Sequence, residues 1–147
     1  MIEFQKVYDL FTECGMSEPG YFVMYINPTS NEAEWLPTQE AVGLIGCDEE
    51  QEELEKRINN EPGWITLPDK RDLDLGSRLP LRFAEEHLKP EDCDLVYNFF
   101  RHRGAYSNFR AFLDRLGMTE KWYQYEDNAI REALKQWLID EEIEFSE

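Results

Sequence analysis

Residues 21–37 read YFVMYINPTSNEAEWLP, and this stretch decides the fold class. Its first part, Tyr21–Ile26, is rich in aromatic and β-branched side chains, which favour strands. Asn27–Asn31 follows with residues that favour turns, and Ala33–Leu36 then offers a second strand. We therefore predict a β-hairpin over Tyr21–Leu36 with antiparallel strands.

A third strand and several helices complete the prediction. Trp64–Leu67 lies between a glycine and a proline and is expected to join the sheet of the hairpin. Apolar residues recur at helical spacing in most of the remaining chain. The fold class is then α+β, with a small antiparallel sheet (hairpin plus a third strand) packed against a mainly helical C-terminal half. Helices are predicted over residues 2–14, 48–60, 79–88, 90–102, 105–116 and from 119 onward, and residues 1–147 are expected to form a single domain.

Two local patterns make this prediction specific. Asp48 and Gln51 have the spacing of a capping box, so a helix should begin directly after Asp48. In the last helix, Trp137 shares an apolar stripe with Ile130 and Leu134, and we expect Trp137 to be largely buried.

The net charge of the chain limits the classes of partner that it can bind. It has 32 Asp and Glu against 15 Lys and Arg, a formal net charge of −17. Such a charge repels phosphate backbones and anionic lipid, so we expect neither direct nucleic-acid binding nor membrane binding. It suits a protein partner, with a basic surface as one option, or an acidic polyanion mimic of the immunity-inhibitor type. The oligomeric state is left open.

Motifs for catalysis and for cofactors are missing from the sequence. The two histidines, His87 and His102, lie in no recognisable pattern, and no glycine-rich phosphate loop appears. Cys14, Cys47 and Cys93 match no metal-binding spacing and fit reduced thiols. The sequence shows neither a signal peptide nor an apolar run that could cross a bilayer. We expect a cytoplasmic protein without cofactor or metal. The sequence favours a non-enzymatic role and leaves an enzyme open as an alternative.

One segment runs against the overall charge. Residues 101–115 contain four of the 15 basic residues and one acid, and aromatic residues follow at 122–125. Guanidiniums and aromatic faces could hold an anionic ligand or partner. Alternatively, the arginines pair with the protein's own carboxylates while the aromatic residues belong to the core. The candidate binding residues are Arg101, Arg103, Arg110, Trp122 and Tyr125.

The same region carries a family resemblance. Residues 103–113 (RGAYSNFRAFL), the WYQY of residues 122–125 and the helix that ends Gln136-Trp137-Leu138 resemble uncharacterised protein family 0158, a bacterial family of unassigned function. The likeness covers roughly residues 20–143 and departs at Tyr106 and Asn108, where phenylalanine and a basic residue are more usual. The resemblance implies the α+β fold and a bacterial cytoplasmic setting, and it implies no mechanism.

The sequence therefore favours a non-enzymatic cytoplasmic interaction or regulatory protein. One alternative is a small-ligand-binding domain or enzyme with a site near Arg103, Arg110 and Trp122. The other alternative is the acidic polyanion mimic.

Overall fold

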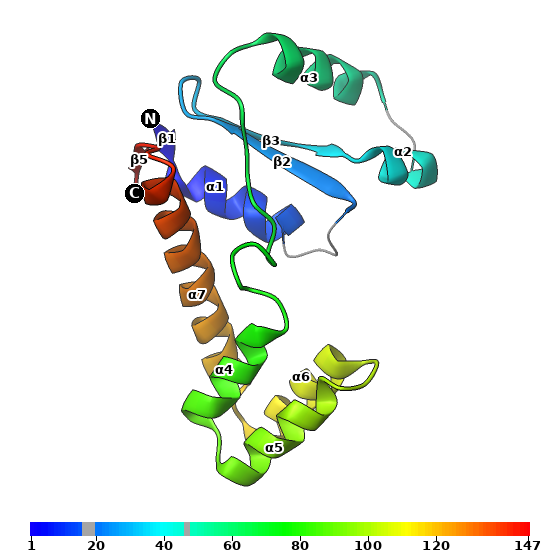
Figure 1. Ribbon diagram of the computed structural model, residues 1–147, viewed down its shortest axis with the longest axis vertical. Helices are drawn as coiled ribbons and strands as arrows, with labels where there is room; N and C mark the ends of the chain where they lie inside the picture. The colour runs from blue at the N-terminus through cyan, green and yellow to red at the C-terminus, as the bar shows by residue number, and fades with distance from the viewer. Residues whose placement is uncertain (16–19, 46–47) are drawn as a thin grey trace. The chain divides into compact units, whose positions relative to one another are not determined.

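The computed structural model describes residues 1–15, 20–45 and 48–147 and divides into two compact units. The first unit comprises Met1–Leu73 and Ala133–Glu147, and the second comprises Asp74–Glu132. A single domain over the whole chain stays a prediction. Along the chain (Figure 1) the elements are β1 Ile2–Glu3, α1 Phe4–Leu10, the π-helical turn η1 Phe11–Gly15, β2 Phe22–Asn27, β3 Glu32–Pro37, α2 Gln39–Ile45, α3 Glu49–Asn60, β4 Ile65–Thr66, α4 Arg78–His87, α5 Pro90–Phe99, α6 Ala105–Leu116, α7 Thr119–Asp140 and β5 Phe145–Ser146.

The predicted hairpin and third strand are confirmed. β2 pairs with β3 antiparallel, in a register that runs from Phe22 opposite Pro37 to Asn27 opposite Glu32. β4 pairs antiparallel with the other edge of β2, so the strand order is β3-β2-β4. Helices α1, α2 and α3 contact β3. The fold class is therefore α+β, as the alternation in residues 21–37 predicted.

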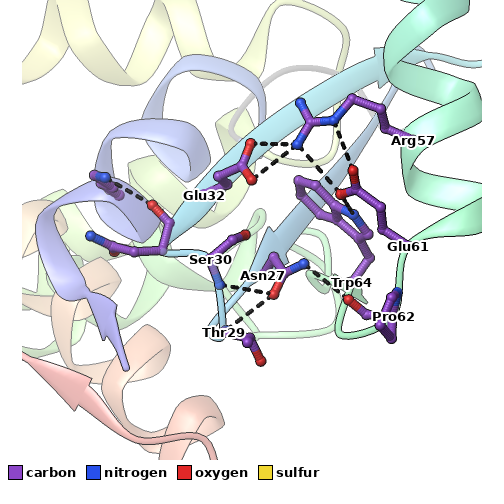
Figure 2. A network of polar contacts seen from close by, with 10 residues as sticks. Asn27, Thr29, Ser30, Glu32, Arg57, Glu61, Pro62 and Trp64 are labelled. Atoms are coloured by element: carbon purple, nitrogen blue, oxygen red, sulfur yellow. Dashed lines mark hydrogen bonds and ion pairs between the residues drawn. The ribbon is translucent and has the colours of Figure 1, made fainter.

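The buried side chain of Asn27 organises the turn of the hairpin (Figure 2). Asn27 is 3% exposed, and its Oδ1 accepts hydrogen bonds from the backbone N–H groups of Thr29 at 3.1 Å and Ser30 at 3.3 Å. Its Nδ2 donates to the carbonyl of Pro62 at 3.2 Å. An amide that bonds to the backbone two and three residues ahead closes a turn. Asn27 thus fixes the turn and joins it to the segment that leads into β4.

Helix α3 begins as its capping box predicts. The Asp48 carboxylate accepts from the backbone N–H of Gln51 at 2.8 Å, and the Gln51 side chain accepts from the backbone N–H of Asp48 at 3.3 Å. No side chain of α3 is fully buried. At its other end Arg57 forms an ion pair with Glu32 of β3 at 2.9 Å (Figure 2), which fixes the helix end to the hairpin.

The second unit is held together by aromatic rings. Trp122 lies at the centre: its ring centroid is 5.1 Å from that of Phe109 and 5.4 Å from that of Phe83, with the planes near perpendicular. Phe83 in turn contacts Phe109 at 6.4 Å. Edge-to-face contacts at these distances are the geometry that aromatic pairs prefer. The core therefore joins α4, α6 and the first part of α7.

Trp137, which was expected to be largely buried, has intermediate exposure and does not belong to the fully buried core. The buried stripe of α7 consists of Ile130, Leu134 and Leu138, which follow one another at intervals of four. Trp137 lies about 60° around the helix from Leu134 and about 100° from Leu138, at the edge of this stripe. The fully buried tryptophan of α7 is Trp122, which is 1% exposed.

Two further details differ from the sequence prediction. Residues 2–14 were expected to form one helix, but Ile2 and Glu3 form a strand that pairs in parallel with Phe145 and Ser146. The helical spacing of residues 105–116 also predicts that Leu116 faces inward, but Leu116 is exposed at the end of α6. A two-residue strand pairs through its backbone with a distant segment, so its own side chains carry little signal of it.

Candidate functional site

The charge of the chain is unevenly divided between the two units. The second unit, Asp74–Glu132, contains nine Lys and Arg and eleven Asp and Glu, so it is close to neutral. The first unit contains the remaining six basic and twenty-one acidic residues. The acidity of the protein is therefore a property of the first unit, and an anionic partner meets much less repulsion at the second.

The four arginines of residues 101–115 are all exposed, and they lie in and beyond the turn between α5 and α6. Arg101 and Arg103 belong to the turn, and Arg110 and Arg115 belong to α6. Among the described residues none of the four forms an ion pair with a carboxylate. The structure therefore does not show the pairing with the protein's own acids that was the alternative interpretation of this segment.

Other arginines of the same chain do find carboxylates. Arg78 pairs with Asp74 at 3.8 Å, and Arg131 pairs with Asp127 at 3.0 Å, both within the second unit. Asp127 and Arg131 lie one turn apart on the surface of α7, whereas Asp74 lies in the turn before α4. Arg110 and Asp114 have the same spacing, but Arg110 binds a different group.

Arg110 is held by Tyr123 of α7. Its Nη2 donates to the Tyr123 hydroxyl at 2.6 Å, and its guanidinium carbon lies 5.8 Å from the centroid of the same ring. A guanidinium has five N–H donors, so this one bond leaves others available. The contact fixes Arg110 at the hydroxyl end of Tyr123 without neutralising its charge.

A second tyrosine lies beside this pair. The Tyr106 hydroxyl donates to Glu126 at 3.0 Å, which is a second bond between α6 and α7. Burial of the hydroxyl and the nearby Glu126 carboxylate raise the pKa of Tyr106 well above its ordinary value. Tyr106 therefore stays a neutral donor at physiological pH, and its bond occupies Glu126.

Arg115 points along the opposite side of α6. Its guanidinium carbon lies 5.7 Å from the ring centroid of Phe112. Five positions separate Arg110 from Arg115, or about 140° around the helix, so the two guanidiniums do not share one face. Gly104 precedes α6 with a φ of +72°, a left-handed conformation that glycine adopts without strain and that turns the chain between Arg103 and the helix.

Trp122 and Tyr125 occupy different surroundings from the arginines. Trp122 is packed among rings of the core, and its Nε1 has no hydrogen-bond partner among the described residues. Tyr125 is partly exposed and packs edge-on against Phe83 at 5.3 Å, and burial together with Glu86 raises its pKa. The aromatic residues that do meet the exposed guanidiniums are Tyr123 and Phe112, which the sequence argument did not select. The sequence shows how far Tyr123 and Phe112 lie from the arginines along the chain. It does not show which aromatic side chain contacts an arginine.

The remaining candidates for chemistry are structural or exposed. His87 packs against the ring of Phe83 at a centroid distance of 5.0 Å, and His102 is exposed in the turn before α6. Cys14 and Cys93 are free, and burial raises the pKa of both thiols; Cys47 lies outside the described residues. In the described ranges, no cluster of three or more His, Cys, Asp or Glu side chains is arranged to hold a metal ion. None of the described helices is long and apolar enough to span a bilayer.

The fold and this segment define a small α+β protein with an acidic unit that contains the three-stranded sheet and a helical unit that exposes arginines without a carboxylate partner among the described residues. Residues 38–147 match the model of an uncharacterised protein family, UPF0158, and the chain belongs to this family. The matched segment includes the whole of α4 to α7, while the strands of the hairpin precede it. No curated protein and no solved structure matches the chain.

Proposed function

We propose that this protein is a non-enzymatic interaction protein and that the Arg101–Arg115 segment is where its partner binds. The observation that carries the proposal is the set of four exposed arginines that pair with no carboxylate of the described residues, in a chain with about twice as many acids as bases. Guanidiniums in this state offer N–H donors for the oxygen atoms of a partner, with bidentate geometry for a carboxylate.

The chemistry of the segment suits binding better than catalysis. Arginine keeps its proton at any physiological pH, so it does not act as a general acid or base. Arg110 is positioned by Tyr123, and Arg115 by the ring of Phe112, which lowers the entropy lost when a partner binds. Such positioning supports recognition of a partner.

We also propose a cytoplasmic setting and a regulatory role. The free thiols of Cys14 and Cys93 support a reducing compartment, because such compartments keep cysteines unpaired. In this regulatory role the protein would act by binding to a surface of its partner protein and covering it.

The test is partner capture from a lysate of the native host with three proteins: the wild type, Arg103→Gln/Arg110→Gln, and the control Arg78→Gln/Arg131→Gln. The two variants lose the same charge, but the control removes arginines that are already paired with carboxylates. We expect the first variant to stay folded and to lose the partner, while the control retains it. Capture by the wild type should weaken as salt rises, because exposed charges are screened.

Folding is checked by urea unfolding, in which exposed pairs contribute only about 0–1 kcal/mol each. Retention of every partner by Arg103→Gln/Arg110→Gln would reject the proposal and leave the acidic surface of the first unit as the remaining candidate.

A further inference from the structure

We infer that the partner presents an acidic amphipathic helix, whose apolar side chains pack on α5 and α6 while its carboxylates bind the arginines; this inference rests on the proposed function. The surface that would receive it consists of the exposed Leu95 and the partly exposed Phe99 of α5 and the exposed Leu116 of α6, above the buried ring of Phe112. These four residues are here called the α5–α6 strip.

The strip is apolar and partly uncovered. Phe99 and Phe112 make an edge-on contact with centroids 5.6 Å apart, which joins the two helices. Leu95 lies one helical turn before Phe99, and Leu116 lies one turn after Phe112, so each leucine is on the face of its helix that carries the ring contact. Leu95 is 45% exposed and Leu116 41% exposed. Both values are high for leucines beside a core contact.

Guanidiniums lie beside this strip and at one end of α5. Arg115 lies over the ring of Phe112, which is itself a member of the strip. Arg101 and Arg103 belong to the turn that follows Phe99, where backbone bonds from Arg101 to Asn98 and from His102 to Phe99 continue the helical course. Among the described residues none of these arginines pairs with a carboxylate. An apolar surface with unpaired cations beside it is complementary to apolar side chains with acids beside them.

The charge of the protein selects a peptide over a nucleic acid as the occupant. A nucleic acid brings a regular array of phosphates that extends beyond the strip, and it would be repelled by a chain of net charge −17. A short acidic helix places a few carboxylates near the arginines, and repulsion from more distant acids is screened beyond about 8 Å at physiological salt. The bases and sugars of a nucleic acid would also leave the two leucine side chains without apolar contacts.

A helix is the form of peptide that fits two neighbouring helices. Apolar residues spaced at i and i+4 on both α5 and α6 present ridges, and a third helix packs its own ridges against such a surface. Partners that bind in this way present anchors at i, i+3, i+4 and i+7. Glu91 lies one turn before Leu95 and is exposed, so the acids of the partner should lie toward the arginine end of α5 and away from Glu91.

Selection from a random peptide display library with the full-length wild-type protein tests the inference without assuming a sequence. We expect the selected peptides to combine Leu or Phe at i and i+3 or i+4 with Asp and Glu. Synthetic copies are then titrated by fluorescence anisotropy against three variants: Leu95→Ser/Leu116→Ser, Arg103→Gln/Arg115→Gln, and the control Ile139→Ser, which removes an exposed apolar side chain of the first unit.

The first two variants should each weaken binding about tenfold or more, since removal of an anchor or of a charge partner acts mainly on the bound state. The control should bind like the wild type. Circular dichroism confirms that each variant is folded. Selected peptides that are neutral or basic, no enrichment of any peptide, or equal affinity for the wild type and Leu95→Ser/Leu116→Ser would each overturn the inference.

The same variants separate the inference from the proposed function. If the host partner is lost with Arg103→Gln/Arg110→Gln but is captured normally by Leu95→Ser/Leu116→Ser, the segment binds a partner and the acidic-helix inference fails. If Arg103→Gln/Arg110→Gln retains the partner, the proposed function itself fails.

Discussion

The guanidinium of Arg110 donates to the hydroxyl of Tyr123 at 2.6 Å, so one side chain of α7 sets the position of a cation on α6. The guanidinium carbon lies 5.8 Å from the ring centroid, which places it beyond the hydroxyl and not over the face of the ring. The hydrogen bond is therefore the contact that holds Arg110.

We therefore predict that partner capture weakens when the hydroxyl of Tyr123 is removed. Tyr123→Phe keeps the ring and loses the acceptor that holds Arg110, so it should weaken capture about as much as Tyr123→Ala does. Stability should change little, because Tyr123 is exposed. Capture from host lysate at fixed salt measures the effect, and urea unfolding is the control. Capture by Tyr123→Ala equal to that by the wild type would show that the position of Arg110 is irrelevant to binding.

The two tryptophans of α7 should differ in their contribution to stability. Trp122 is fully buried among Phe83 and Phe109, so Trp122→Ala should cost about 3–5 kcal/mol in free energy of unfolding. Trp137 is partly exposed, and Trp137→Ala should cost clearly less. Urea unfolding of both variants measures the difference. Equal losses would mean that Trp137 is packed as completely as Trp122.

These tryptophans also show which parts of the fold the sequence could predict. The hairpin and the start of α3 depend on neighbouring residues, such as the turn formers after Ile26 and the Asp48–Gln51 capping box, and both were predicted. Periodicity identified the apolar stripe of α7 but not how far around the helix the fully buried face extends. Trp137 lies within about 60° of Leu134, so spacing alone places it with the stripe.

The candidate site depended more on tertiary structure. The exposed, basic character of residues 101–115 was visible in the sequence, as four arginines with one acid. Which ring each arginine meets depends on how α5, α6 and α7 pack against one another. Tyr123 and Phe112 could therefore not be distinguished from Trp122 and Tyr125, which the packing places elsewhere.

Gly63 should be among the least replaceable glycines of the described chain. It has a φ of +94°, and a Cβ atom there would lie 2.8 Å from Oδ1 of Asn27, the atom that closes the hairpin turn. Gly104 also has a positive φ, but a Cβ atom there would meet no atom within 4 Å. We predict that Gly104→Ala costs about 1–2 kcal/mol, from backbone strain alone.

Gly63→Ala should cost more than Gly104→Ala, because it adds a steric conflict with Asn27 to the strain. Thermal and urea unfolding of the two variants provide the comparison. A Gly63→Ala protein as stable as Gly104→Ala would show that the turn can move away from Asn27 without loss.

The ion pair between Arg57 and Glu32 should make stability depend on acid pH. Hydrogen bonds from Arg57 come first among the causes that lower the pKa of Glu32 below its ordinary value of 4.5. A carboxyl whose pKa is lower in the folded state than in the unfolded state stabilises the fold above the unfolded pKa. That contribution is lost as pH falls through the folded pKa. The wild type should therefore be more stable than Arg57→Gln at neutral pH, and the difference should shrink below pH 4.5.

The measurement is the urea midpoint of the wild type and of Arg57→Gln across this range of pH. Lys56→Gln is the matched control. It also removes one positive charge, and Lys56 is exposed on the same helix directly before Arg57. The difference in stability between the wild type and Lys56→Gln should not shrink in the same way below pH 4.5. Arg57 also forms an ion pair with Glu61. The variant Glu32→Gln therefore measures the part of the pH-dependent stability that comes from Glu32 alone. If the difference between the wild type and Arg57→Gln stays constant from neutral to acid pH, the pair seen in Figure 2 does not hold the end of α3 to the hairpin in solution.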